Sequence, residues 1–388
     1  MQLKRNAIDQ IFQTIDANAE KYLDFLYQIC SFEARAYDKQ TIDHMVDYIL
    51  AFAQGEGMEV KRTPMEKCGD FLTVEINPGA EKGCLFQAHM DTVHEKGVFG
   101  DPAVRTDEER MYGPGVIDCK GGIAIALLTM KALLENGFEK HVRLILTSDE
   151  EISNILGGPD EIRFIQESAK GFPCAINCET AEGDQVVIAR KAILKYRLDV
   201  KGVSGHAGKH YFTSKNAIVE AAHKIIALHS KSVEGGTTYS CNIISGGSVA
   251  NIIPDQCSIT VDIRAVSVED MEIAKQEMEN VANASFISGT TCRLTLLSVR
   301  PPMEKSAKTM QILNRLLDVC HKYDLGTLTP MESGGGSDSC YTQIAGIPSI
   351  CGMGASGGFQ HTPKEFLCKD SVPLRAKILS GFLCAENN

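Results

Sequence analysis

The sequence lacks the features that mark several common classes of protein. It is poor in positive charge, with 39 Lys and Arg against 50 Asp and Glu and a formal net charge of -11. This argues against nucleic acid as a partner, because phosphate contacts need a basic surface. No apolar run approaches the roughly 18 residues that span a membrane, and the longest, 121–130, is about half that length. We therefore expect neither a nucleic-acid-binding protein nor a membrane protein.

The cysteines and the N-terminal segment also lack recognisable patterns. Fourteen cysteines are present without a C-x-x-C pair, so neither a zinc ribbon nor a disulfide framework is predicted. Residues 1–26 contain no apolar segment of the kind found in secretion signals, and we expect an amphipathic helix of the folded protein there. Cysteines that remain as free thiols are typical of proteins in the reducing cytoplasm, which is where we expect this protein. The 44% of hydrophobic residues supply a sizeable core, which excludes global disorder.

Short apolar runs alternate with helical periodicity between residues 71 and 178, which is typical of an α/β layer with a mainly parallel core sheet. Strands are expected at 71–76, 84–89, 142–147 and 173–177, and helices at 121–137, closed by Gly137, and 160–170.

A second pattern begins near residue 192. Strands at 192–202, 240–245, 257–265 and 291–299 and helices at 216–230 and 268–284 follow one another in the order β-α-β-β-α-β, which is the ferredoxin-like plan. Alternating helices and strands resume after Arg300-Pro301-Pro302. We therefore expect one α/β domain formed by 1–191 and 303–388, with a ferredoxin-like domain, 192–302, inserted into it.

Acidic residues and histidines follow the predicted core strands. They are His89 and Asp91 after the strand 84–89, Glu150 and Glu151 after 142–147, and Glu179 after 173–177, with Asp118 before a Gly-Gly helix start and His361 far downstream. The carboxyl ends of the strands in an open α/β sheet form the crevice where ligands bind. We expect these side chains to meet there.

Such a cluster would repel itself without a cation, since like charges ~4 Å apart cost about 4 kcal/mol at an effective dielectric of 20. Nitrogen and oxygen ligands suit zinc or a similar first-row ion. The spacing of His89 and Asp91 is typical of a metal-bound imidazole whose other nitrogen is held by a carboxylate. Each residue alone is more often a cap, a surface charge or a buried polar group, but their joint placement favours a metal site.

Nine motifs in order along nearly the whole chain resemble those of the co-catalytic zinc metallopeptidases, the family that includes acetylornithine deacetylase, succinyl-diaminopimelate desuccinylase, aminoacylase and glutamate carboxypeptidase. The motifs are HMDTV (89–93), GPGVIDCKGG (113–122), SDEEIS (148–153), Glu179, GVSGHAG (202–208), GGSVANIIP (246–254), VDIR (261–264), SGGGSD (333–338) and His361.

The resemblance implies two zinc ions, or another divalent first-row metal such as cobalt or manganese. It implies that Asp118 bridges the metals, that His89 and Glu179 complete one site, and that Glu151 and His361 complete the other. Asp91 would orient His89, Glu150 would be the general base that moves a proton from water to the leaving amine, and the peptide bond between Asp118 and Cys119 would be cis.

The substrate-binding candidates follow from the same resemblance. His206 corresponds to the residue that donates to the tetrahedral oxyanion, in some relatives from the partner subunit. Arg300 matches the arginine that grips the substrate carboxylate in glutamate carboxypeptidases. Asn251 and Arg264 are further candidates for holding that end of the substrate, although Arg264 also suits a structural salt bridge. Gly335 is expected to shape the pocket.

Within this family a glutamate at position 179 goes with carboxypeptidases and deacylases rather than aminopeptidases. We expect the removal of a C-terminal amino acid, with glutamate as one candidate, from a peptide or N-acyl amino acid. The alternatives are an N-acyl-amino-acid deacylase with the same machinery, an inactive binding protein of the same fold, and a structural metal protein. Every matching ligand and base position is intact, which argues against the inactive protein, and structural zinc sites are usually Cys-rich.

The resemblance implies that the inserted domain supports a homodimer. The hinge-like junctions at Lys191 and Arg300-Pro301-Pro302 suggest that it also closes over the substrate as a lid. The other conspicuous signals are weak. GMGASG (352–357) matches a dinucleotide fingerprint, but the residues after it cannot open the required helix. The remaining histidines show no partner pattern and are predicted to be structural or surface residues: His94, His210, His223, His229 and His321.

Overall fold

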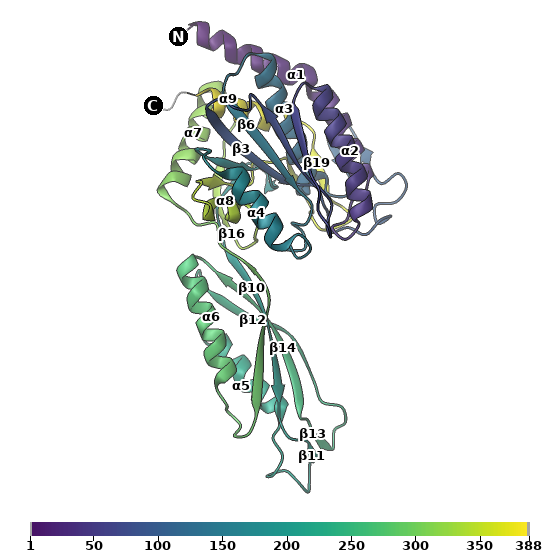
Figure 1. Cartoon of the computed structure of the whole chain (residues 1–388), viewed down its shortest axis with the longest axis vertical. Coiled ribbons are helices and arrows are strands. Elements are labelled where there is room, and N and C mark those ends of the chain that lie inside the picture. Colours follow the sequence, from purple (N-terminus) through teal and green to yellow (C-terminus); the bar gives the residue numbers. More distant parts are fainter. Residues whose placement is uncertain (1, 386–388) are drawn as a thin grey trace. The chain divides into compact units, whose positions relative to one another are not determined.

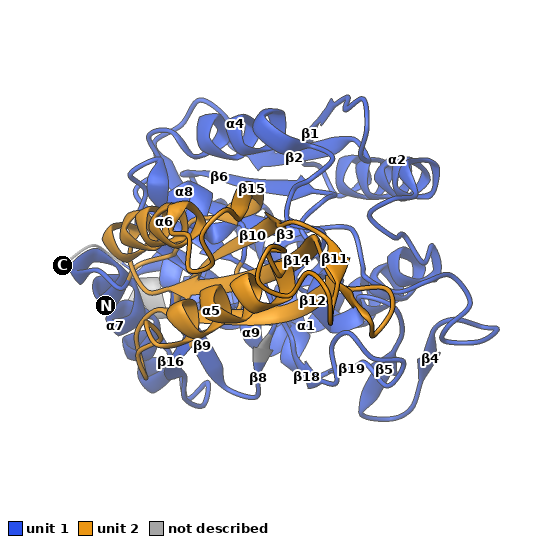
Figure 2. Cartoon of the chain, turned by 90° about the horizontal axis from the view of Figure 1, so that it is seen from below, with its two compact units in different colours: residues 1–189, 305–332, 337–388 blue, residues 190–304, 333–336 orange. Residues whose placement is uncertain are grey.

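The structure is a computed structural model that describes residues 2–385. The chain divides into two compact units (Figure 2). The second unit consists of Arg190–Glu304 together with Ser333–Gly336, and the first contains the rest of the described chain. The predicted insertion, 192–302, lies inside the second unit. The short return segment, 333–336, was not expected from the sequence.

The first unit is built on a six-stranded sheet with the order β1-β2-β6-β3-β7-β17 (Figure 1). The strands are β1 (Glu59–Thr63), β2 (Phe71–Ile76), β3 (Lys82–His89), β6 (His141–Thr147), β7 (Ala175–Asn177) and β17 (Ser349–Ile350). Neighbours from β6 to β17 are parallel, whereas β1 and β2 are antiparallel. The predicted mainly parallel core sheet is confirmed.

Helices cover both faces of this sheet. They are α1 (Gln2–Ser31), α2 (Lys39–Gly55), α3 (Gly121–Glu135), α4 (Gly158–Ala169), α7 (Ala307–Tyr323), α8 (Ser339–Ile344) and α9 (Ser371–Cys384). Because successive side chains of a strand point to opposite faces, Phe86 of β3 packs with α1, α3 and α9, while its neighbour Leu85 packs with α4 and α8. A strand that is apolar on both faces is therefore buried on both faces.

Local chemistry explains the ends of α3, the helix that lies deepest in this layer. Its first two residues are Gly121 and Gly122, and position 122 requires a glycine because a Cβ atom there would lie 1.9 Å from the carbonyl oxygen of Cys178. It ends before Gly137, whose φ of 71° is left-handed. The predicted helices and strands of this region are confirmed to within three residues at each end. The N-terminal helix is confirmed as well, with Ile8, Ile11 and Ile15 on its buried side.

The first unit also holds a sheet of short strands that the sequence did not suggest. Its order is β4-β5-β19-β18-β8, formed by β4 (Arg105–Thr106), β5 (Arg110–Tyr112), β19 (Phe366–Cys368), β18 (Ser356–Gly358) and β8 (Ala181–Glu182). Strands of two or three residues are too short to show alternation. A two-stranded sheet pairs β9 (Gln185–Arg190) with β16 (Thr329–Ser333), where the chain passes between the units.

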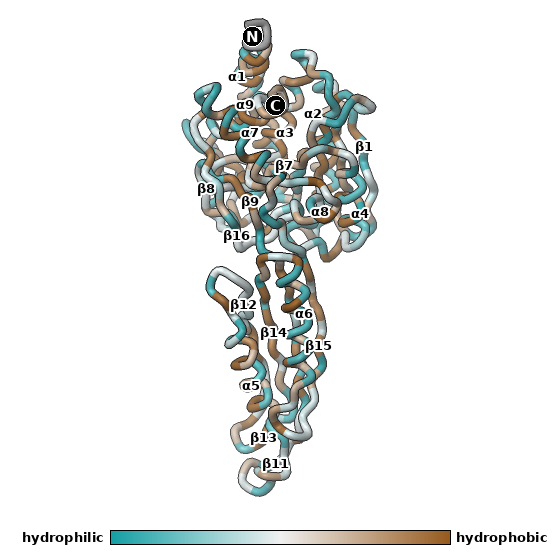
Figure 3. The backbone as a smooth tube through the Cα atoms, turned by 90° about the vertical axis from the view of Figure 1, so that its left-hand side faces the viewer, coloured by the Kyte–Doolittle hydropathy of each residue, from teal (hydrophilic) through white to brown (hydrophobic). Residues whose placement is uncertain are grey.

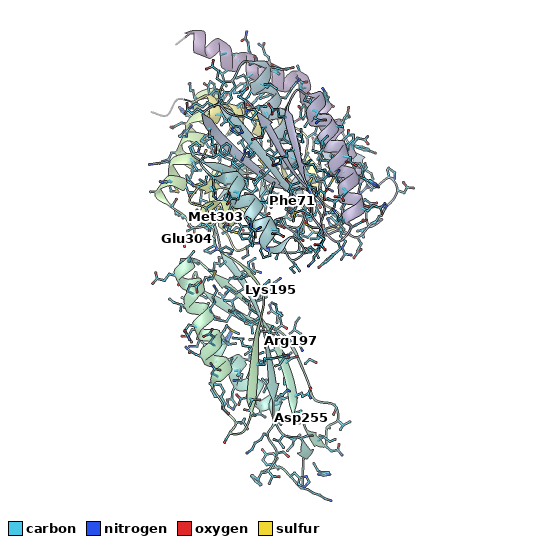
Figure 4. The ribbon with its side chains drawn as sticks, in the orientation of Figure 1. Phe71, Lys195, Arg197, Asp255, Met303 and Glu304 are labelled. Atoms are coloured by element: carbon cyan, nitrogen blue, oxygen red, sulfur yellow. The ribbon has the colours of Figure 1, made fainter. Side chains whose placement is uncertain are left out.

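The second unit is a four-stranded antiparallel sheet, β12-β14-β10-β15, with two helices. Along the chain its elements are β10 (Ala192–Lys201), α5 (Ala217–His229), β12 (Thr238–Gly246), β14 (Gln256–Ala265), α6 (Val268–Asn283) and β15 (Thr291–Arg300), and β11 (Gly205–His206) pairs with β13 (Ile252–Ile253). The β-α-β-β-α-β order matches the sequence prediction. Leu194 and Leu198 of β10 are buried, whereas Lys195 and Arg197 point to solvent (Figure 4).

Figure 3 shows the hydropathy of each residue along the chain. Burial alternates regularly along β10, whereas β12 and β15 carry apolar residues that are exposed, Ile243 and Ile244 in the first and Leu296 and Leu297 in the second. The fourteen cysteines are all free thiols. Among the described residues, none of the helices combines the length and apolar character needed to cross a membrane.

Candidate metal centre

Three neighbouring parallel strands deliver the first site residues. His89 is the last residue of β3, which lies between β6 and β7 in the sheet. Glu150 and Glu151 follow β6 by a few residues, and Glu179 follows β7. Because the three strands are parallel, their carboxyl ends lie at one edge of the sheet, and the loops that leave this edge carry the four side chains.

Two loops complete the cluster. Asp118 lies in the helical turn η1 (Val116–Lys120), where its φ of -113° and ψ of 92° depart from helical values. The peptide bond between Asp118 and Cys119 is cis, as predicted. His361 follows β18 and has a φ of 61°. The Asp118 carboxylate lies between two imidazoles: Oδ1 is 3.3 Å from His89 Nε2, and Oδ2 is 3.1 Å from His361 Nε2.

Each imidazole faces one further carboxylate. His89 Nε2 is 3.3 Å from Oε1 of Glu179, and His361 Nε2 is 3.3 Å from Oε2 of Glu151. Two ligands each about 2.0–2.1 Å from a tetrahedral ion would lie roughly 3.3 Å apart. The spacings therefore fit two ions, one beside each histidine, that share the Asp118 carboxylate.

Hydrogen bonding within the described residues does not satisfy this cluster. His89 Nε2 is buried within 3.3 Å of two carboxylate oxygens, yet it makes no hydrogen bond in the described structure, and neither does Oε1 of Glu151. Buried polar atoms are normally paired. Buried nitrogen and oxygen atoms that lack hydrogen bonds are suitable ligands for a divalent metal ion.

The electrostatics lead to the same conclusion. Burial and the nearby Asp118 carboxylate raise the pKa of Glu151 to about 8. Burial likewise raises the pKa of Glu179. Hydrogen bonds to Asp118 and Glu151 raise the pKa of His361 to about 11. Without a cation the cluster holds protons near neutral pH, and a metal ion would replace them.

Asp91 connects His89 with the loop after β6. Its carboxylate Oδ1 lies 3.3 Å from His89 Nδ1, and its backbone carbonyl lies 3.2 Å from the same nitrogen. The carboxylate also accepts hydrogen bonds from the backbone N–H groups of Glu150 at 3.4 Å and Glu151 at 3.1 Å. Asp91 is fully buried, so these contacts hold the ring and the loop together.

Glu150 and Cys119 lie beside the cluster. The Glu150 side chain is close enough to contribute to the raised pKa of Glu151 and Glu179. Cys119 Sγ accepts from the backbone N–H of His89 at 3.2 Å, and burial raises the pKa of its thiol well above the usual range. Cys119 is fully buried in the turn beside Asp118, which is consistent with the prediction of a small packed side chain.

Comparison with known proteins identifies the family. Residues 85–385 match the model of peptidase family M20/M25/M40. The chain belongs to this peptidase family. It is therefore a hydrolytic enzyme. The described residues include two groups that could hold a metal ion, His89 with Asp118 and Glu151, and His89 with Cys119 and Glu179.

Individual relatives are distant. Carboxypeptidase G2 of Pseudomonas sp. (strain RS-16) is 26% identical over 374 residues, which cover 94% of this chain and 89% of that protein. Succinyl-diaminopimelate desuccinylase of Rickettsia felis is 26% identical over 285 residues, covering 67% and 73%.

Among solved structures, a Staphylococcus aureus tripeptidase has a TM-score of 0.79 at 20% identity and covers 94% of this chain and 98% of that chain. A dinuclear metal-binding peptidase of Bacillus subtilis has a TM-score of 0.70 at 15% identity and covers 95% and 98%. These likenesses show the fold.

The other predicted residues of the family site belong to the second unit. His206 is exposed in β11, and its Nδ1 accepts from the backbone N–H of Gly208 at 3.1 Å. The carbonyl of Asn251 accepts from the N–H of Ala207 at 3.0 Å, so His206 and Asn251 lie on neighbouring segments.

The predicted arginines gather at the return segment of the second unit. Arg264 donates to the carbonyl of Gly334 at 3.0 Å and pairs with Asp262 at 2.6 Å. Arg300 is buried, and a Cβ atom on Gly336 would lie 2.7 Å from its Cδ. The structure thus brings Arg264 and Arg300 to the segment that contains Gly335.

Sequence reasoning missed two residues of these networks. Arg190 donates to the carbonyls of Gly335 and Gly336 at 3.3 and 3.1 Å. Glu365 is fully buried and contacts the loop that carries Asp118. A carboxylate four residues after the predicted ligand His361 is the only sequence signal for Glu365, and nothing in the local pattern marks Arg190.

Proposed function

We propose that this chain is a di-zinc hydrolase that cleaves the amide bond to a C-terminal amino acid of a peptide or N-acyl amino acid. One observation carries the proposal: the two oxygens of Asp118 face two different imidazoles, and each imidazole faces a carboxylate of its own. The similarity to carboxypeptidase G2 over most of the chain supports a carboxypeptidase activity.

In this proposal the carboxylate of Asp118 would be shared by the two metal ions, which would be zinc or another divalent first-row metal such as cobalt or manganese. His89 and Glu179 would hold one ion, and Glu151 and His361 would hold the other. When bound, the metals polarise the substrate carbonyl and lower the pKa of a coordinated water toward about 7.

The remaining steps belong to side chains. Glu150 accepts a proton from the attacking water and returns it to the nitrogen of the leaving amine, which leaves the base as it began. Its position beside Glu151 and Glu179 supports this role. Asp91 keeps the proton of His89 on Nδ1, so that Nε2 is free to bind a metal ion.

Substrate recognition is assigned to the second unit. Arg300 binds the free carboxylate of the substrate, because a planar guanidinium makes two parallel hydrogen bonds to it. Arg264 and Asn251 support the same end, Gly335 leaves room for the substrate, and His206 donates to the tetrahedral oxyanion. We also propose a homodimer and a lid function for this unit. Its outer strands β12 and β15 each have one edge that pairs with no other strand among residues 2–385.

The second candidate function is an N-acyl-amino-acid deacylase. The similarity to a desuccinylase favours it, and the same metal ligands and base would serve both reactions. The two activities differ in the acyl side of the substrate. An inactive binding protein of the same fold is disfavoured because the ligand cluster and the base position are complete.

Release of free amino acid from a panel of N-acyl amino acids and dipeptides tests these assignments. The zinc-loaded protein would be compared with Glu150→Ala and with Lys305→Ala, a control in an exposed salt bridge of the first unit. Turnover of C-terminal glutamate substrates by wild type and control, but not by Glu150→Ala, would support the carboxypeptidase and the base. Turnover of simple N-acyl amino acids alone would support the deacylase. Two bound metals without any turnover would contradict the substrate class.

A further inference from the structure

Glu365 is buried and contacts the loop that contains Asp118, the proposed bridging ligand. Its Oε1 accepts hydrogen bonds from the backbone N–H groups of Ile117 at 3.0 Å and Asp118 at 3.2 Å. Its Oε2 accepts from the N–H of Gly115 at 3.2 Å and lies 2.7 Å from His94 Nε2. Four groups that can donate thus surround one fully buried carboxylate, and each of its oxygens has two partners.

His94 is placed to hold the carboxylate rather than to bind a ligand. Its ring is buried and packs edgewise against Phe99, with 4.8 Å between ring centroids. Beside an acceptor-only carboxylate, Nε2 of the ring is the donor. Of the two settings predicted for His94, structural or surface, the structure shows the first, because the ring is buried and paired with Glu365.

The loop from 114 to 120 is also tied together internally. The buried side chain of Lys120 donates to the carbonyl of Pro114 at 3.1 Å, and its backbone N–H donates to the carbonyl of Gly115 at 3.0 Å. These hydrogen bonds tie the two ends of the loop together, so a group that holds the loop's backbone N–H groups also restrains the backbone that carries the Asp118 carboxylate.

We propose that Glu365 is a positioning residue that sets the Asp118 carboxylate between the imidazoles of His89 and His361. Glu365 follows His361 by four residues, so a single segment supplies one proposed metal ligand and the anchor of another. The inference rests on the proposed di-metal function. It adds a residue that contacts neither metal nor substrate but determines how tightly the metals bind.

Zinc affinity of the metal-free protein, measured by competition with a chromogenic chelator, tests this role without any substrate. In Glu365→Gln the amide NH2 must face donors, so the loop shifts and the zinc dissociation constant is expected to rise about tenfold or more. The visible spectrum of the cobalt-loaded protein is expected to change as well, because it reports ligand geometry. Thermal unfolding of the metal-free variant measures how much stability the substitution removes apart from metal binding.

Glu56→Gln is the matched control. Glu56 is another buried carboxylate of the first unit, paired with Lys21 and Lys131 away from the site. This variant is expected to lose thermal stability while keeping wild-type zinc affinity and cobalt spectrum. A general loss of packing would change the zinc affinity and the cobalt spectrum of both variants equally. If Glu365 positions Asp118, these two quantities change only in Glu365→Gln.

A second pair of variants covers the case in which Glu365→Gln does not fold. His94→Leu removes one of the four contacts and is expected to weaken zinc binding, whereas His94→Gln keeps an N–H donor and is expected to bind more tightly than His94→Leu. Unchanged zinc affinity and cobalt spectrum in Glu365→Gln, or equal affinity of the two His94 variants, would overturn the inference alone. A wild-type protein that binds no metal would overturn it together with the proposed function.

Discussion

Asp91→Asn offers a sharp test of how the site is held together. The carboxylate lies 3.3 Å from His89 Nδ1 and accepts the N–H groups of Glu150 and Glu151. An asparagine keeps one oxygen for these partners and turns an NH2 group toward either the ring or the loop. Toward the ring, the NH2 group favours the tautomer with a proton on Nε2, which cannot bind metal.

The magnitude follows from the contacts that survive. Loss of such a partner typically lowers metal affinity about 10–100-fold. The backbone carbonyl of Asp91 lies 3.2 Å from His89 Nδ1 and still accepts its proton in the variant. We therefore expect the lower end, about a tenfold rise in the zinc dissociation constant, which equals ~1.4 kcal/mol. Added zinc in excess would then stabilise the variant by about 1.4 kcal/mol less than wild type.

The assay is thermal and urea unfolding with and without zinc, alongside direct zinc titration. Asp70→Asn is the control, since Asp70 is also buried in the first unit and accepts from Lys39 at 2.6 Å and Arg62 at 2.6 Å. The control should lose the same stability in both conditions and keep its zinc affinity. Wild-type zinc affinity in Asp91→Asn, or equal losses in both variants, would refute the reasoning.

Three further predictions follow from single contacts. Glu150→Gln should keep both metals and lose about 10²–10⁴-fold in kcat; a loss below tenfold would rule out the general base. Burial alone would raise the pKa of Asp70, but hydrogen bonds from its neighbours lower it. The stability advantage of wild type over Asp70→Asn, about 2 kcal/mol by urea unfolding, should therefore persist down to about pH 4 and shrink below it; an advantage that widened in acid would contradict the sign. Gly122→Ala places a Cβ atom 1.9 Å from the Cys178 carbonyl oxygen and should lower the free energy of unfolding by about 3 kcal/mol. Zinc affinity should fall as well, because Glu179 directly follows Cys178; unchanged affinity would show that the end of this strand does not move.

Periodicity predicted the elements of both units because their strands and helices are long and bury a repeating set of side chains. The residues 192–201 alternate so regularly that the buried face of β10 follows from the sequence alone. The placement of acidic residues after the strands at 84–89 and 142–147 likewise predicted which side chains meet, since parallel strands deliver their ends to one edge.

Other features had no comparable signal. Strands such as β18 and β19 contain three residues each, too few to show a period. Glu365 binds backbone N–H groups, which every residue except proline carries, so nothing in the sequence distinguishes its partners. The return segment 333–336 is held by hydrogen bonds from Arg190 and Arg264 to its carbonyls, and these contacts also leave no pattern in the sequence.

The carboxylates around the centre fall into two classes by their partners. Asp91 and Glu365 accept backbone N–H groups, which stabilise their negative charge without any cation. Each also faces an imidazole, at His89 Nδ1 and His94 Nε2 respectively. Asp118, Glu151 and Glu179 instead face the Nε2 atoms of His89 and His361. In the proposed centre, two divalent ions carry four positive charges and these three carboxylates offset three, which leaves one. That remaining charge favours the anionic form of a water nucleophile, and a further carboxylate among the ligands would remove it. The backbone N–H contacts of Asp91 and Glu365 therefore matter to the chemistry as well as to the geometry, because they keep these two carboxylates from becoming metal ligands.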